Sequence, residues 1–212
     1  MNRLARRDDA GARLGDALRS GCQIADHAFD ALLPPRYRSL SGDHWTPVGT
    51  ALQAARWLCP DARARVLDVG AGVGKACVIG SLATSATFVG VEQRPHLVEV
   101  ARQRAASVGA SSATFLCADA FSLDWSEFDG LYFFNPFSEA DLPVQLRQDS
   151  TVAYPEDDHA QTMAKLIGKL ASLKPGARVS VFHALGCPLP EEFRRAEHAE
   201  HGDSALELWV KR

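Results

Sequence analysis

The stretch that most constrains the fold is a short apolar run that leads into three alternating glycines, residues 65–75 (RVLDVGAGVGK). The apolar run predicts a buried strand, the glycines predict a tight turn, and the residues after Gly74 predict the start of a helix. Glycines at such a turn let the backbone approach a ligand closely, and the first helical turn aims its free N–H groups at that ligand. We therefore expect a nucleotide-like cofactor at this turn.

Two common cofactor sites use a turn of this kind, and the spacing of the glycines excludes both. A dinucleotide-binding turn of the form GxGxxG would need its third glycine at the position of Lys75. A phosphate-binding P-loop would need its first glycine at Val69 and its serine or threonine at Ala76. A glycine turn that binds nothing is the structural alternative, so the choice depends on residues further along the chain.

What remains, Asp68-x-Gly70-x-Gly72-x-Gly74, resembles motif I of the class I, Rossmann-like methyltransferases that use S-adenosylmethionine. In that family the glycines make room for the methionine and ribose of the cofactor, and no phosphate has to be held. The resemblance implies that the chain binds S-adenosylmethionine and releases S-adenosylhomocysteine. It places the following turn residues around the cofactor: Asp68, Gly70, Ala71, Gly72 and Gly74.

Two later apolar runs end in acids that fit the same cofactor. Glu92 stands 22 residues after Gly70, close to the interval of about 20 residues at which dinucleotide-binding folds place a ribose-binding acid. Asp119 closes the next run, and the resemblance implies that such an acid accepts a hydrogen bond from the adenine amino group. The next backbone N–H then faces the adenine ring, with an apolar side chain nearby. The cofactor-binding residues expected from these two runs are Glu92, Gln93, Asp119, Ala120 and Phe121.

A fourth apolar run, 129–134, ends in Asn135-Pro136-Phe137. Methyl transfer is an in-line displacement, so the protein mainly has to position the acceptor. We expect Asn135 to take part in catalysis and also to be among the residues at the cofactor. Its side-chain oxygen can accept hydrogen bonds from an amino group, and Phe137 can stack on a planar or cationic group. The triplet is similar to the Asn/Asp-Pro-Pro-aromatic element of the DNA adenine and glutamine N-methyltransferases, with one proline missing. We therefore expect N-methylation of a protein side chain or a small molecule; alternatively, Asn135 only caps a following helix.

The loop before the first strand carries a finer resemblance. Residues 41–47 (SGDHWTP), with the glycine turn and Asn135-Pro136, resemble a group of bacterial methyltransferases that is distantly similar to the non-SET histone-lysine methyltransferases. The resemblance implies that Trp45 and Thr46 cover the methionine end of the cofactor, with the Thr46 hydroxyl near its carboxylate. The lysine enzymes carry an Asn-Asn-Phe element after strand four, so lysine specificity is not implied here.

Four further polar residues are weaker candidates. His183, late on a predicted strand, is either a base that contacts the substrate or a satisfied core histidine. With His183 as the base, the chain would be an O-methyltransferase of a small metabolite. A non-catalytic cofactor-binding module that acts through its N-terminal helices is the other alternative. His44 and Tyr154 are candidate contacts at the site, and Lys75 is expected to reach solvent.

Composition limits the remaining possibilities. The 212 residues, 46% of them hydrophobic, suit one α/β domain, with a predicted helical extension over 1–45 and a cofactor-binding domain over 46–212. The net charge of −3, with no run of five like charges, gives no indication of a nucleic-acid-binding surface. Five cysteines without a CxxC pair indicate reduced thiols, a cytoplasmic protein and no metal site. No apolar stretch is long enough to span a membrane, and the acceptor and oligomeric state stay open.

The order of the predicted elements indicates a doubly wound, mostly parallel seven-stranded sheet behind an N-terminal helical extension. A Leu-Lys-Pro-Gly turn at 173–176 is similar to the turn that commonly precedes the fifth strand of these methyltransferases. The predicted strands are 65–69, 86–91, 112–117, 129–134 and 177–183, with a terminal hairpin over 192–199 and 205–211. The predicted helices are 10–33, 48–58, 74–84, 95–107 and 158–173, with a short one over 142–146 and a loop over 148–157.

Overall fold

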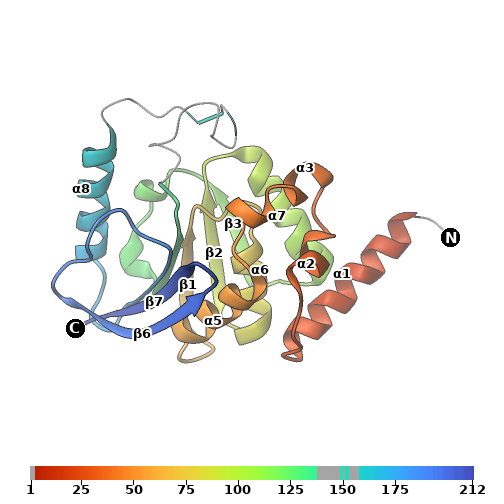
Figure 1. Ribbon diagram of the computed structural model, residues 1–212, viewed down its shortest axis with the longest axis horizontal. Helices are drawn as coiled ribbons and strands as arrows, with labels where there is room; N and C mark the ends of the chain where they lie inside the picture. The colour runs from red at the N-terminus through yellow and green to blue at the C-terminus, as the bar shows by residue number, and fades with distance from the viewer. Residues whose placement is uncertain (1–2, 138–148, 150, 153–157) are drawn as a thin grey trace.

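A seven-stranded sheet forms the centre of the molecule in the computed structural model, which describes residues 3–137, 149, 151–152 and 158–212 (Figure 1). Its strand order is β3-β2-β1-β4-β5-β7-β6. The first five strands pair in parallel, and β7 pairs antiparallel with both β5 and β6. The predicted doubly wound, mostly parallel sheet is therefore confirmed. The strands are β1 (Arg65–Val69), β2 (Thr87–Glu92), β3 (Ala113–Cys117), β4 (Gly130–Phe134), β5 (Arg178–Phe182), β6 (Phe193–His201) and β7 (Ser204–Lys211).

Helices cover both faces of the sheet, because neighbouring residues of a buried strand point to opposite sides. Val66 of β1 packs with the side chains of α5, α6 and α7, whereas Leu67 packs with those of α8 and two short 3-10 turns. Both residues are fully buried. The helices are α1 (Arg3–Arg19), α2 (Asp26–Asp30), α3 (Pro35–Arg38), α4 (Ser41–His44), α5 (Val48–Leu58), α6 (Lys75–Thr84), α7 (Pro95–Val108) and α8 (Asp158–Ala171); the 3-10 turns are η1 (Ala120–Ser122) and η2 (Trp125–Glu127).

The N-terminal region differs from its prediction. One helix over 10–33 was wrong, because α1 ends at Arg19 and α2 begins only at Asp26. The break is a helix C-terminal motif with Gly21 in the left-handed region, at φ 72°. The N–H of Gly21 bonds to the carbonyl of Leu18, and the N–H of Cys22 bonds to that of Ala17.

The C-terminal half of α1 packs against the sheet domain. Leu14 and Leu18 of α1 belong to the core that also contains α6 and α7, and α1 lies beside α7 in Figure 1. The Arg19 guanidinium donates a 2.6 Å hydrogen bond to the carbonyl of Gly109, just after α7. One face of α1 is thus buried. The domain boundary between residues 45 and 46 stays a prediction.

The remaining predictions concern the C-terminal hairpin, the segment after β4 and membrane-spanning helices. The terminal hairpin is confirmed as β6 and β7. The predicted short helix over 142–146 and the candidate Tyr154 fall outside the residues that the structure describes, as does most of the 148–157 loop. None of the helices described here has the length and apolarity that a membrane span needs.

Candidate functional site

The predicted cofactor residues meet at the carboxyl edge of the sheet, between β1 and β4. This is the point where the strand order reverses, which is where open α/β sheets bind ligands. A small cavity of about 40 Å³ lies there. It is lined by Val69, Gly70, Val91, Glu92, Gln93, Arg94, Ala118, Ala120, Pro136 and Phe137.

The glycine turn adopts a backbone that only glycine adopts easily. Gly70, Gly72 and Gly74 have φ values of 77°, 54° and 76°. A Cβ at Gly72 would stand 2.6 Å from the ring of Trp45, and one at Gly70 would stand 2.9 Å from Pro136. The turn therefore lies directly beneath the Trp45 ring and against the segment after β4.

Trp45 and Thr46 are held over this turn from both sides. The Trp45 ring is buried, and its Nε1 donates a 2.7 Å hydrogen bond to the carbonyl of Tyr37. The Thr46 hydroxyl is 3.1 Å from the hydroxyl of Tyr132 on β4. The loop that the resemblance placed at the methionine end of the cofactor thus contacts the glycine turn, and His44 packs beside it against Trp45.

Glu92 is the polar side chain that joins the turn to β2. Its Oε2 accepts from the N–H of Gly72 at 3.2 Å, and its Oε1 accepts from the N–H of Arg94 at 3.0 Å. The Arg94 guanidinium lies 3.6 Å from the same Oε1 and donates to Asp149 at 3.2 Å. The sequence analysis did not predict Arg94 or Asp149 as site residues. Because Arg94 pairs with Glu92, a ligand that binds Glu92 also meets a buried cation beside it.

Asp68 lies beneath the turn as a buried carboxyl group. Its Oδ2 accepts a hydrogen bond from Cys77 Sγ at 3.3 Å. Burial raises the pKa of Asp68 from its ordinary 3.8 to about 7, the Cys77 hydrogen bond lowers it, and the nearby Glu92 carboxylate raises it. Burial also raises the pKa of Tyr132 above its usual range. At neutral pH, Asp68 is therefore a carboxyl group close to its midpoint.

The predicted adenine-side residues stack with the segment after β4. The Asp119 carboxylate accepts from the N–H of Phe121 at 2.9 Å and so begins the turn η1. The Phe121 ring stacks on Phe137 with centroids 5.4 Å apart, and on Trp125 at 6.0 Å. Phe137, which we expected to contact the acceptor, thus lies against the side of the pocket where we expect adenine.

Asn135 and His183 share an unusual backbone conformation at the ends of adjacent strands. Their φ values are 44° and 66°, in the left-handed region. The His183 ring stacks on Phe134, the last residue of β4, at 5.2 Å, and bonds to the Ser204 hydroxyl at 2.9 Å. Partial burial lowers the pKa of His183, which favours the neutral imidazole. Both residues lie at the edge that carries the glycine turn, so both remain candidates.

One prediction about this edge was wrong. Lys75, expected to reach solvent, is 2% exposed, and its Nζ contacts two carboxylates of α2. The glycine turn is therefore fastened to the N-terminal region through the first residue of α6.

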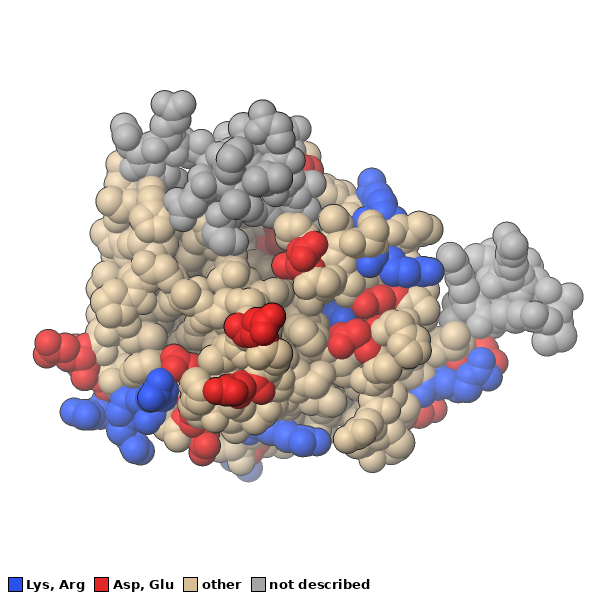
Figure 2. All heavy atoms as spheres, in the orientation of Figure 1, with Lys and Arg blue, Asp and Glu red and all other residues tan. Residues whose placement is uncertain are grey.

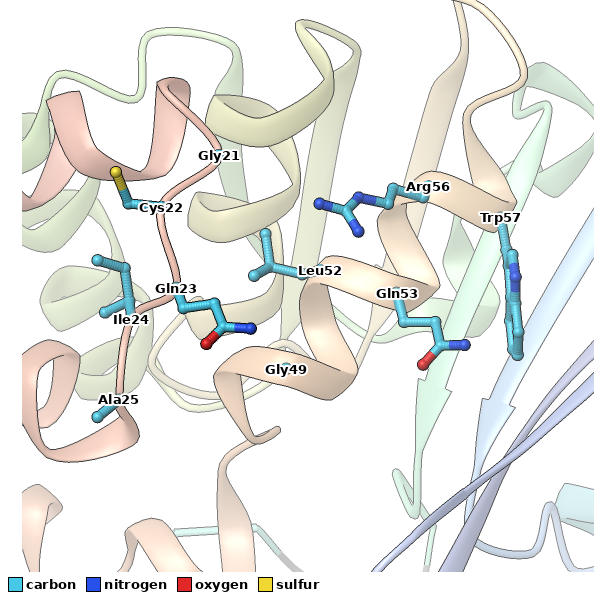
Figure 3. A pocket seen from close by; sticks show the side chains of 10 residues that line it. All are labelled: Gly21, Cys22, Gln23, Ile24, Ala25, Gly49, Leu52, Gln53, Arg56 and Trp57. Carbon is cyan, nitrogen blue, oxygen red and sulfur yellow. The ribbon is translucent and has the colours of Figure 1, made fainter.

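A second hollow, of about 930 Å³, lies between α5 and the connection from α1 to α2 (Figure 3). It is lined by Gly21, Cys22, Gln23, Ile24, Ala25, Gly49, Leu52, Gln53, Arg56 and Trp57. None of the predicted cofactor or acceptor residues belongs to this lining, so the hollow is separate from the glycine turn.

Charged side chains are spread unevenly over the face shown in Figure 2. Acidic side chains lie across the middle of this face, and basic ones gather near its edges. The face shown carries no continuous basic stripe.

Comparison with known proteins identifies the class. A family model described as a methyltransferase domain matches residues 60–181, which is more than half of the chain. The match begins five residues before β1, includes the glycine turn and ends one residue before the end of β5. The chain belongs to this methyltransferase-domain family.

Among curated proteins, an O-methyltransferase of Aspergillus nomiae is 30% identical over 135 residues. The match covers 62% of this chain, and the chain spans about half, 52%, of that relative's length.

Solved structures share the fold. An RNA methyltransferase from Salinibacter ruber in complex with S-adenosyl-L-homocysteine has a TM-score of 0.54 at 21% identity, over 78% of this chain and 92% of that one. TrmN from Thermus thermophilus has a TM-score of 0.57 at 20% identity, over 79% and 49%. MtNAS, in a variant in complex with S-adenosylmethionine, has a TM-score of 0.53 at 15% identity, over 95% and 73%. These likenesses support the class I methyltransferase fold.

Proposed function

We propose that this chain is a methyltransferase that uses S-adenosylmethionine and methylates a nitrogen atom of a protein side chain or a small molecule. The observation that carries the proposal is the left-handed glycine turn, packed between Trp45 and Pro136, with the Glu92 carboxylate bound to its backbone. Because glycine has no Cβ, the backbone of this turn can pass close to a ligand. Bound S-adenosylmethionine supplies an activated methyl group on a sulfonium.

The residues at the turn suit this cofactor. Glu92 is buried and can accept hydrogen bonds from ribose hydroxyls. Trp45 and Thr46 would close the methionine end, and Phe121 with Phe137 would flank adenine. The cavity of about 40 Å³ has room for on the order of one water molecule.

Asn135 is the residue that we assign to the acceptor. It follows β4 at the same sheet edge, in a strained left-handed conformation of the kind that gathers at functional sites. Its side-chain oxygen can accept hydrogen bonds from an amino group and fix the direction of the nitrogen lone pair, with Pro136 and Phe137 continuing the acceptor segment.

The cofactor part of the proposal is tested by isothermal titration of the folded protein with S-adenosylhomocysteine. We expect one site per chain. A folded sample that shows no heat of binding at millimolar ligand would overturn the cofactor assignment.

Asn135→Ala tests the acceptor part. We expect the S-adenosylhomocysteine affinity to stay near that of the wild type, because Asn135 is assigned to the acceptor. We expect turnover to fall by on the order of 100-fold, because acceptor positioning is lost. Turnover is measured with methyl-labelled S-adenosylmethionine and those lysate fractions that the wild-type protein labels. Loss of cofactor binding in this variant would instead assign Asn135 to the cofactor.

O-methylation of a small metabolite is the second candidate, favoured by the curated relative from Aspergillus nomiae and by the neutral His183 beside Ser204. Mass spectrometry of the labelled product separates the two, since an ester or ether and an amine differ in hydrolysis and fragmentation. His183→Ala should abolish labelling only in the O-methyl case. Cofactor binding without any labelling would favour a non-catalytic module.

We also infer a reducing compartment, the cytoplasm, for this protein. All five cysteines are free, and Cys77 is buried against Asp68. Such thiols persist where disulfides do not form.

A further inference from the structure

Lys75 is a buried cation at an unfavourable place in its helix. It is the first residue of α6, where the helix dipole disfavours positive charge. Its side chain is 2% exposed and lies 5.5 Å from the centre of the Phe29 ring. A buried charge needs partners, because its desolvation is costly. Lys75 can therefore be buried here only together with groups that compensate its charge.

Two carboxylates of α2 supply these partners. Lys75 Nζ is 2.6 Å from Asp26 Oδ1 and 3.0 Å from Asp30 Oδ1. Asp26 is half-exposed, whereas the Asp30 side chain is only 9% exposed. One ammonium group thus joins the glycine turn to α2, a contact between segments 45 to 49 residues apart.

The same carboxylates hold the loop that covers the turn. Asp30 Oδ2 accepts from the Ser41 hydroxyl at 2.7 Å, and Asp26 Oδ1 accepts from the N–H of Val48 at 2.8 Å. Ser41 and Val48 stand on either side of the pair Trp45-Thr46. The loop is therefore fixed at both of its ends by groups that Lys75 holds in place.

We propose that Lys75 is a positioning residue that sets the distance between the Trp45-Thr46 loop and the glycine turn. It acts through Asp26 and Asp30 and does not touch the cofactor. The inference rests on the proposed function, because its consequence is the shape of the methionine end of the cofactor site. Trp45 already stands so close to Gly72 that no Cβ fits between them, so a small displacement of the loop changes this site.

Lys75→Met tests the proposal on the full chain. We expect the S-adenosylhomocysteine affinity to fall by on the order of tenfold at a temperature where the variant is fully folded. In the protein without cofactor, amide hydrogen exchange over residues 41–48 should become faster, while exchange in β1 and β4 stays slow. The exchange experiment needs no cofactor, so it separates failure of this proposal from failure of the proposed function.

Two further variants distinguish positioning from stability. Arg19→Met removes another anchor of the N-terminal region, the bond to Gly109, and should leave the affinity unchanged. The triple variant Lys75→Met, Asp26→Asn and Asp30→Asn removes the unpaired charges and should recover thermal stability without recovering affinity. Wild-type affinity in the triple variant, or affinity within about twofold of the wild type together with unchanged exchange in Lys75→Met, would overturn the proposal.

Discussion

Gly72→Val is expected to abolish cofactor binding and to destabilise the fold by about 4 kcal/mol. Valine at φ 54° is strained by roughly 1–3 kcal/mol, because its branched Cβ is disfavoured in the left-handed region. Its Cβ would also stand 2.6 Å from the buried Trp45 ring, and overpacking costs a further 1–3 kcal/mol. Urea unfolding measures the loss of stability, and titration with S-adenosylhomocysteine measures the loss of binding.

Gly202→Val is the matched control. Gly202 has a similar φ of 62°, but nothing lies within 4 Å of a Cβ built there, at the β6–β7 turn. We expect only the strain cost and unchanged cofactor affinity. Wild-type affinity in Gly72→Val would show that the glycine turn is not the cofactor site.

Asp68→Asn is expected to stabilise the protein without cofactor relative to the wild type, and this difference is expected to grow as pH rises. The folded state holds the Asp68 pKa at about 7, against an ordinary 3.8, mainly because the carboxyl is buried. A raised pKa means that the folded state binds the proton more tightly than the unfolded state. Wild-type stability from this group is complete below about pH 4 and is lost as pH rises towards 7. The difference between variant and wild type should reach on the order of 4 kcal/mol above pH 7.

Urea unfolding of both proteins between pH 4 and pH 8 measures this difference. Asp124→Asn is the control of opposite sign, because hydrogen bonds from Ser126 lower the Asp124 pKa. Relative to the wild type, the Asp124→Asn variant should gain no stability as pH rises. A flat difference for Asp68→Asn would show that the buried carboxyl does not titrate in this range. We also expect Asp68→Asn to bind S-adenosylmethionine more weakly, since a stabilising change at a functional site commonly costs function.

The sheet could be predicted from the sequence because its signals are local. Each of the first five strands is an apolar run bounded by glycine, proline or polar residues, and β1 has the predicted bounds of Arg65–Val69. The bounds of the N-terminal helices were harder to predict than those of the strands. The helical periodicity of apolar residues continues across Gly21. Only the glycine itself indicates that the helix ends between α1 and α2. The four-residue helices α3 and α4 are too short to show a period.

The sequence predicted those residues of the candidate site that directly follow the ends of strands. Glu92 and Gly72 meet as the spacing suggests, because parallel strands end at one edge. The partners of these residues come from distant segments: Asp149 reaches Arg94 across 55 positions, and Asp30 reaches Lys75 across 45. No local pattern specifies such pairs. Lys75 was misjudged because a lysine beside an exposed turn usually extends to water, and only the tertiary packing of α2 places carboxylates there.

The position of β7 between β5 and β6 has a consequence for biosynthesis. β6 precedes β7 along the chain, but it joins the sheet only through β7. A ribosome adding about 5–20 residues per second makes the nine residues of β6 before it makes β7, the partner of β6 among the strands that the structure describes. The edge formed by β1, β2 and β4 is by then already synthesised. The strands that carry the glycine turn can therefore pair before β6 does, and the backbone groups of β6 stay unpaired until β7 has been made.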